Sequence, residues 1–66
     1  MNVYVNGAEE RIPSPLSVSD FLKEKEIVSR NVVVEYNGVI LKSDEYGSTS
    51  LKESDRLEIL RILGGG

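Results

Sequence analysis

The sequence predicts an α+β domain in which one helix packs across one face of a mixed sheet of four to five strands, in the order β-β-α-β-β-β. Three observations predict this fold class. Two Asn-Gly dipeptides, at residues 6–7 and 37–38, each lie between segments of strand character, and this dipeptide is a strong signal for a two-residue hairpin turn. A single helix start at residues 17–22 separates the two hairpins. An apolar segment at residues 57–63 follows them.

Residues 2–6 and 9–12 form the first predicted hairpin. Polar residues alternate with Val3 and Val5 in its first strand, which is the period of a strand with one buried face. The hairpin ends at residues 13–15, Pro-Ser-Pro, because proline fixes φ and lacks the N–H group that a sheet ladder requires.

A short helix is predicted near residues 18–26. Ser17 is its expected N-cap, and Asp20 three residues later approximates a capping box. Leu16 and Phe21 stand at the two positions of a hydrophobic staple. One apolar stripe of this helix faces the sheet, and it consists of Val18, Phe21 and Leu22.

The second predicted hairpin comprises a strand at residues 31–36 and a brief strand at 39–41. Alternation places the side chains of Val32, Val34 and Tyr36 on one face. Residues 42–50 form a polar loop, which Tyr46 is expected to anchor to the body of the domain. A turn at residues 51–55 then leads into the last strand, which begins at Arg56.

The position of the helix predicts how the sheet closes. A helical crossover suits parallel strands and a hairpin suits antiparallel ones, so we expect the last strand to lie parallel beside the first. This is the β-grasp arrangement. We assign residues 1–63 to the β-grasp domain and residues 64–66 to a flexible C-terminal glycine tail.

The last strand contains a break in its apolar alternation. Leu57 and Ile59 have one parity, whereas Leu60 and Ile62 have the other, so the four side chains cannot all face the helix. We expect Leu60, Ile62 and Leu63 to form an exposed apolar patch where a partner enzyme docks. The alternative is that Ile62 and Leu63 tuck under the end of the domain.

Composition argues against catalysis by this chain. The 66 residues include no cysteine and no histidine, which removes the thiolate nucleophile, the usual zinc ligands and the usual general base near neutral pH. The adjacent acidic pairs at 9–10 and 44–45 are typical of solvated surface. The sequence therefore predicts no catalytic residue, no metal site and no stably bound cofactor.

Charge and hydropathy limit the kinds of partner and the cellular compartment that we expect. A formal net charge of -3 has the wrong sign for neutralising phosphates, so we do not expect nucleic acid binding. No apolar run approaches the roughly 20 residues that span a bilayer, and the N-terminal residues do not resemble a signal peptide. We expect a cytoplasmic protein without a membrane partner.

The three glycines at 64–66 carry the candidate chemistry. A glycine segment at an unanchored chain end is slim and mobile, so it can thread a narrow enzyme channel and present the carboxylate of Gly66. In that interpretation Gly64 and Gly65 lie in the channels of partner enzymes. The alternative interpretation is that these residues are an incidental disordered end.

With these features the chain resembles the ThiS-type sulfur carrier proteins of thiamin biosynthesis, which are small relatives of ubiquitin. The resemblance covers essentially the whole chain. It is carried by residues 3–7, 17–22, 34–38 and 55–59 and by the glycine tail.

The resemblance implies a function for Gly66. An ATP-dependent adenylyltransferase of the ubiquitin-activating type would join AMP to its carboxylate. Sulfur from a donor such as a cysteine desulfurase would then replace AMP and leave a thiocarboxylate. Thiazole synthase would use that sulfur to form the thiazole ring, and the carrier would act as a substrate rather than an enzyme.

Three alternative functions remain open. Two of them use the same glycine tail, and the third does not use it. A ubiquitin-like protein modifier would form an isopeptide bond to lysine after the same activation. The small subunit of molybdopterin synthase would insert its tail in a partner active site. A binding module with an incidental tail would use no carboxylate chemistry.

Overall fold

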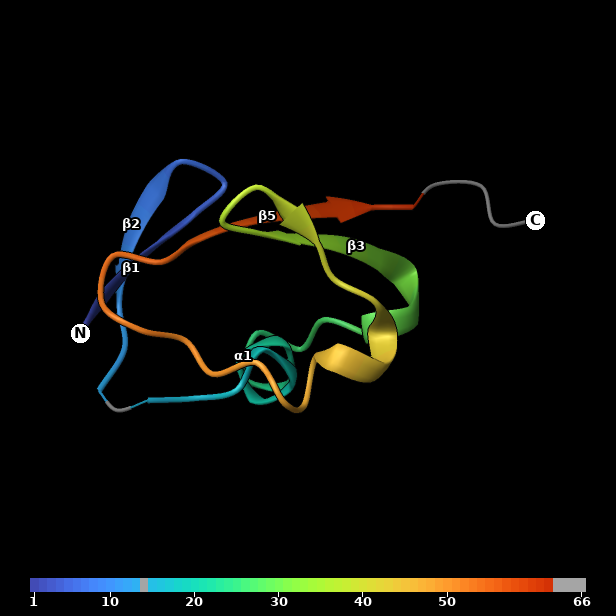
Figure 1. Ribbon diagram of the computed structural model, residues 1–66, viewed down its shortest axis with the longest axis horizontal. Coiled ribbons are helices and arrows are strands. Elements are labelled where there is room, and N and C mark those ends of the chain that lie inside the picture. Colours follow the sequence, from blue (N-terminus) through green and yellow to red (C-terminus); the bar gives the residue numbers. More distant parts are fainter. Residues whose placement is uncertain (14, 63–66) are drawn as a thin grey trace.

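The computed structural model of the chain describes residues 1–13 and 15–62. Within these residues one mixed sheet has the strand order β2-β1-β5-β3-β4, and the helix α1 lies across one face of it (Figure 1). The elements in chain order are β1 (Asn2–Val5), β2 (Ala8–Arg11), α1 (Val18–Glu24), the 3-10 helix η1 (Ser29–Asn31), β3 (Val32–Tyr36), β4 (Val39–Ile40), the 3-10 helix η2 (Ser43–Glu45) and β5 (Arg56–Arg61). The predicted element order is confirmed, while η1 and η2 were not predicted.

The strand pairing confirms the predicted closure of the sheet. β1 pairs antiparallel with β2 and parallel with β5, with Tyr4 opposite Arg56. β3 pairs antiparallel with both β4 and β5. The last strand is therefore the centre of the sheet, with a hairpin on each side of it.

Both hairpin turns have the geometry that their Asn-Gly dipeptides predict. The φ angles are 51° at Asn6 and 84° at Gly7, and 49° at Asn37 and 87° at Gly38. Two consecutive residues with positive φ define a type I′ turn, whose twist matches that of the strands it joins.

The helix begins as predicted and ends two residues earlier than predicted. The Ser17 hydroxyl accepts a hydrogen bond of 3.0 Å from the backbone N–H of Asp20, so Ser17 is the N-cap. At the other end Glu26 has a φ of 59°, and Ile27 N–H donates to the Leu22 carbonyl. This is a Schellman motif with glutamate in the left-handed position that glycine usually occupies. The prediction of helix to residue 26 was wrong because no glycine marks this end.

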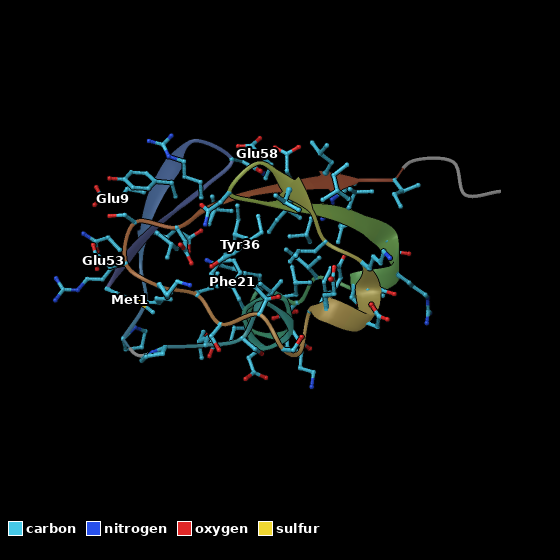
Figure 2. The ribbon with its side chains drawn as sticks, in the orientation of Figure 1. Met1, Glu9, Phe21, Tyr36, Glu53 and Glu58 are labelled. Carbon is cyan, nitrogen blue, oxygen red and sulfur yellow. The ribbon has the colours of Figure 1, made fainter. Side chains whose placement is uncertain are left out.

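The core fills the space between the helix and one face of the sheet. Phe21 and Tyr36 lie between these two layers, whereas Glu9 and Glu58 point away from the helix (Figure 2). Tyr46 is buried, which confirms its predicted role as the anchor of the 42–50 loop. The buried apolar side chains are Val3, Ile12, Val18, Phe21, Leu22, Val32, Val34, Tyr46, Leu51 and Leu57.

Candidate functional site at the end of strand β5

Strand β5 changes from buried to exposed along its length. Leu57 is fully buried and Ile59 packs against the core, whereas Leu60 and Ile62 are 58% and 53% exposed. The alternative in which Ile62 tucks under the domain end is therefore wrong. The helix-facing residues of β5 have odd numbers, and the even-numbered Leu60 and Ile62 lie on the open face of the sheet.

A neighbouring strand extends this apolar surface. Val33 of β3 is directly opposite Leu60, and Glu35 is directly opposite Ile40 of β4, so these side chains share the open face. Ile40 is 64% exposed. We call the surface made by Val33, Ile40, Leu60 and Ile62 the open-face patch. The sequence prediction included Leu60 and Ile62 and missed Val33 and Ile40. The apolar pair Val39-Ile40 in so short a strand was a usable signal for Ile40.

The other half of the open face is polar. Tyr4 is opposite Glu9 on β2 and Arg56 on β5, and the Arg56 guanidinium lies 5.4 Å from the centre of the Tyr4 ring. Glu35 and Glu58 face each other between the two halves. The open-face patch is therefore bounded on the β1 side by charged groups.

A buried carboxylate fixes the start of β5. Asp55 is 6% exposed and accepts hydrogen bonds from the Tyr36 hydroxyl at 2.6 Å, the Asn37 amide at 3.1 Å and the Lys52 N–H at 2.7 Å. The side-chain oxygen Oδ1 of Asn37 also accepts a hydrogen bond from the Arg56 N–H at 2.8 Å. These contacts join the β3–β4 turn to the residue before β5, and the sequence analysis did not predict them.

The Asp55 network shifts two pKa values. Burial opposes ionisation of Asp55, but the hydrogen bonds from Tyr36, Asn37 and the Lys52 backbone outweigh it and lower the pKa below its ordinary value. Burial, together with the hydrogen bond and charge of Asp55, raises the pKa of Tyr36 to about 12. Asp55 is therefore a carboxylate and Tyr36 a neutral phenol at neutral pH, which is the pairing that the 2.6 Å hydrogen bond requires.

The remaining predicted site residues lie outside the described residues. They are Leu63 of the predicted patch and Gly64, Gly65 and Gly66 of the predicted tail, so the proposed boundary between domain and tail also stays a prediction. The described chain ends at Ile62, at the far end of β5 from the β1–β2 hairpin (Figure 1). The role of Leu60 and Ile62 in docking likewise stays a prediction.

Two further properties concern only residues 1–13 and 15–62. They contain no group of three or more His, Cys, Asp or Glu side chains arranged to hold a metal ion. They also contain no helix that is long and apolar enough to cross a membrane.

Comparison with known proteins decides the family. The model of the ThiS family matches residues 2–66, which includes the glycine tail. The chain belongs to the ThiS family. A crystal structure of the thiamine biosynthesis protein (ThiS) from Geobacter metallireducens is 32% identical, with a TM-score of 0.87 over all of both chains. The solution structure of a thiamine biosynthesis protein from the same organism is also 32% identical and has a TM-score of 0.83, covering all of this chain and 88% of that one. These structures confirm the β-grasp fold.

The ThiS-family chain is also similar to part of a larger enzyme. It is 33% identical over 66 residues to the thiazole synthase of Paramagnetospirillum magneticum, matching all of this chain and 20% of that protein. It is 32% identical to the uncharacterized protein ycf40 of Pyropia yezoensis, covering 93% of that protein. The chain thus spans about a fifth of the thiazole synthase and nearly all of the ycf40 protein.

Proposed function

We propose that this ThiS-family protein is a sulfur carrier of thiamin biosynthesis. The observation that carries the proposal is the family match, which runs through the glycines to residue 66. Similarity to one segment of a thiazole synthase supports the choice of that enzyme as the sulfur acceptor. A domain that occurs within an enzyme in one organism is suited to meet the same kind of enzyme as a separate protein in another.

The proposed chemistry converts the Gly66 carboxylate into a thiocarboxylate. One carboxylate oxygen attacks the α-phosphorus of ATP in the activating adenylyltransferase, and pyrophosphate leaves. The acyl adenylate replaces a poor leaving group, oxide, with AMP. The terminal sulfur of a persulfide, on a donor such as a cysteine desulfurase, then attacks the carbonyl carbon and expels AMP. A thiol reductant cleaves the S–S bond of the resulting acyl disulfide, which releases the thiocarboxylate and leaves the donor sulfur in a disulfide with that thiol. In the cytoplasm, thiazole synthase then takes the sulfur from the thiocarboxylate. The carrier itself holds no cofactor and supplies no catalytic group.

The thiocarboxylate is tested by intact mass after incubation with ATP, the cognate adenylyltransferase and a sulfur donor. Exchange of one oxygen for sulfur raises the mass by about 16 Da, and a variant that lacks Gly66 should show no gain. No gain in the full-length chain would refute the proposal and favour a binding module. Adducts on lysines of other proteins would favour a protein modifier, and sulfur transfer only to a molybdopterin precursor would favour the alternative synthase subunit.

The glycine tail makes a second test possible. We propose that Gly65 and Gly66 occupy the activating channel and that Gly64 only extends the reach of the tail. A methyl group at the channel position should collide with its walls, so Gly65→Ala should abolish adenylation, whereas Gly64→Ala should only slow it. Equal loss of pyrophosphate release in the two variants would contradict this assignment.

We also propose that the open-face patch docks the activating enzyme, because the patch includes Leu60 of β5, the strand that precedes the three glycines in the sequence. Leu60 is 58% exposed, so Leu60→Asp should leave the domain folded while it places a charge in the interface. We expect at least a tenfold rise in the KM for the carrier, or about 1.4 kcal/mol. Val28→Asp is the matched control, because Val28 is 49% exposed and precedes η1. Equal effects of the two substitutions would count against the patch.

A further inference from the structure

The backbone groups of β5 alternate between its two neighbouring strands. The Arg56 carbonyl accepts from the Asn37 N–H at 2.8 Å, and Ile62, the residue after β5, donates its N–H to the Asn31 carbonyl at 2.9 Å. The even-numbered residues of β5 therefore pair on the β3 side. Asn6 N–H donates to the Leu57 carbonyl at 2.8 Å, so the odd-numbered residues pair on the β1 side. Every second residue of β5 therefore depends on β1, or on something in its place, for hydrogen bonds.

β1 is too short to pair with all of β5. It ends at Val5, which is opposite Leu57, and the chain then turns back at Asn6 and Gly7. β5 continues beyond this turn (Figure 1). The next odd-numbered residue, Ile59, consequently has no backbone of β1 beside it.

The side chain of Asn6 takes the place of the missing strand at Ile59. Its Oδ1 accepts a hydrogen bond of 2.7 Å from the Ile59 N–H, and its Nδ2 donates to the Ile59 carbonyl at 3.3 Å. A side-chain amide offers the same donor and acceptor as a peptide group. Asn6 thus extends the β1 ladder by one peptide equivalent and closes the edge of β5 as far as Ile59.

Arg61 is the next residue in this series. It is opposite Val32 in a position of the β3 ladder between hydrogen-bonded pairs, so its N–H and carbonyl point toward the β1 side, beyond Asn6. β1 pairs with β5 only at Arg56 and Leu57, and the Asn6 amide bonds to Ile59. Within residues 1–13 and 15–62 no group therefore hydrogen-bonds to the N–H or the carbonyl of Arg61. An unpaired N–H and carbonyl on a strand edge form a template for an added strand.

We propose that an extended segment of the activating adenylyltransferase pairs with β5 at Arg61, in line with β1 and beginning where the Asn6 amide ends. The proposal rests on the proposed function, since this enzyme must hold the chain immediately before the tail. Alternate side chains of the added strand would lie beside Leu60 and Ile62 on the open face. The enzyme segment should therefore carry apolar residues at every second position, and Asn6 should set where the pairing begins.

Two substitutions of Arg61 distinguish the contribution of its backbone N–H to binding from that of its side chain. Arg61→Pro removes the N–H that the partner strand needs, and it breaks no hydrogen bond of the described domain because this N–H is on the open edge. Arg61→Ala is the matched control, since it removes the side chain and keeps the N–H. Both variants should retain the far-UV circular dichroism of the unsubstituted protein.

Affinity for the cognate adenylyltransferase, measured by calorimetry without ATP, is the first readout. We expect Arg61→Pro to weaken binding at least tenfold and Arg61→Ala to change it by less than about threefold. Equal affinities of the two variants would overturn the proposal. If the unsubstituted protein neither binds the enzyme nor gains sulfur, both the proposed function and the added strand are refuted. If the unsubstituted protein gains sulfur and the Arg61→Pro variant gains it equally well, only the added strand is refuted.

Amide hydrogen exchange in the unsubstituted protein is the second readout, and it does not depend on how the proline variant folds. In the free protein the Ile59 and Ile62 amides should be protected and the Arg61 amide should exchange rapidly. Addition of the adenylyltransferase should protect the Arg61 amide. A protected Arg61 amide in the free protein, or an unprotected one in the complex, would overturn the proposal.

Discussion

The buried carboxylate of Asp55 provides the sharpest stability prediction. Three donors converge on it, from Tyr36, Asn37 and Lys52. In Asp55→Asn the shape is kept, but the introduced amide has one acceptor oxygen where the carboxylate has two. Its NH₂ group must face at least one of the three donors. Asn37 cannot turn its amide over to compensate without losing the bond from Arg56 N–H to its carbonyl oxygen.

The magnitude follows from these contacts. A hydrogen bond to a charged group contributes about 1.5–3 kcal/mol and a neutral one about 1 kcal/mol. Loss of one charge-assisted bond and weakening of the other two predict that Asp55→Asn lowers the free energy of unfolding by about 3 kcal/mol at pH 7. In a domain of 66 residues this is a large part of the total stability.

Urea unfolding at several pH values measures the effect. The pKa of Asp55 is lowered from its ordinary value of 3.8. Its ionisation therefore contributes stability that is fully present above 3.8 and is lost as pH falls through the lower, folded-state pKa. The gap between the unsubstituted protein and Asp55→Asn should thus narrow below about pH 4. Asp44→Asn is the control, because Asp44 is exposed. A loss under about 1 kcal/mol, or a gap independent of pH, would refute this account of the network.

Two further predictions concern Tyr36 and the helix. The pKa of Tyr36 is raised from 10.0 to about 12, so the contribution of the neutral phenol to stability is complete below pH 10 and is lost as pH rises through about 12. An absorbance titration should show one tyrosine that ionises near pH 12, and Tyr36→Phe should remove that ionisation. Ser17→Ala removes the N-cap hydrogen bond and should lower the free energy of unfolding by about 1 kcal/mol. Ser19→Ala serves as its control in urea unfolding, and equal losses would contradict the cap assignment.

Local signals account for the parts of the fold that the sequence predicted. The N-cap serine, the two Asn-Gly turns and the alternation of β3 each act within a few residues, so they can be read without knowing the partners of a strand. The end of α1 was missed because it has no such local signal. Glu26 adopts the left-handed conformation in which glycine is usual at a helix end, and a glutamate side chain does not indicate that conformation.

The missed contacts of β5 depend on residues far apart in the sequence. Asn6 and Ile59 are separated by 53 positions, and Asn37 and Asp55 by 18. Their hydrogen bonds exist only once the sheet order and register are fixed, and neither was available from periodicity alone. The parity of Leu60 and Ile62 was predictable because the side-chain alternation of a strand does not depend on its register.

The two Asn-Gly turns therefore have roles beyond reversing the chain. Glycine would satisfy the positive φ at position 6 or 37 equally well, so backbone conformation alone does not explain asparagine there. Asn6 holds Ile59 from the β1 side, and Asn37 holds Arg56 and Asp55 from the β3 side. The central strand is clamped on both edges as far as Ile59 and on one edge beyond it. This combination suits the proposed carrier: the strand is fixed at its base, and its open edge is where the proposed enzyme segment would pair.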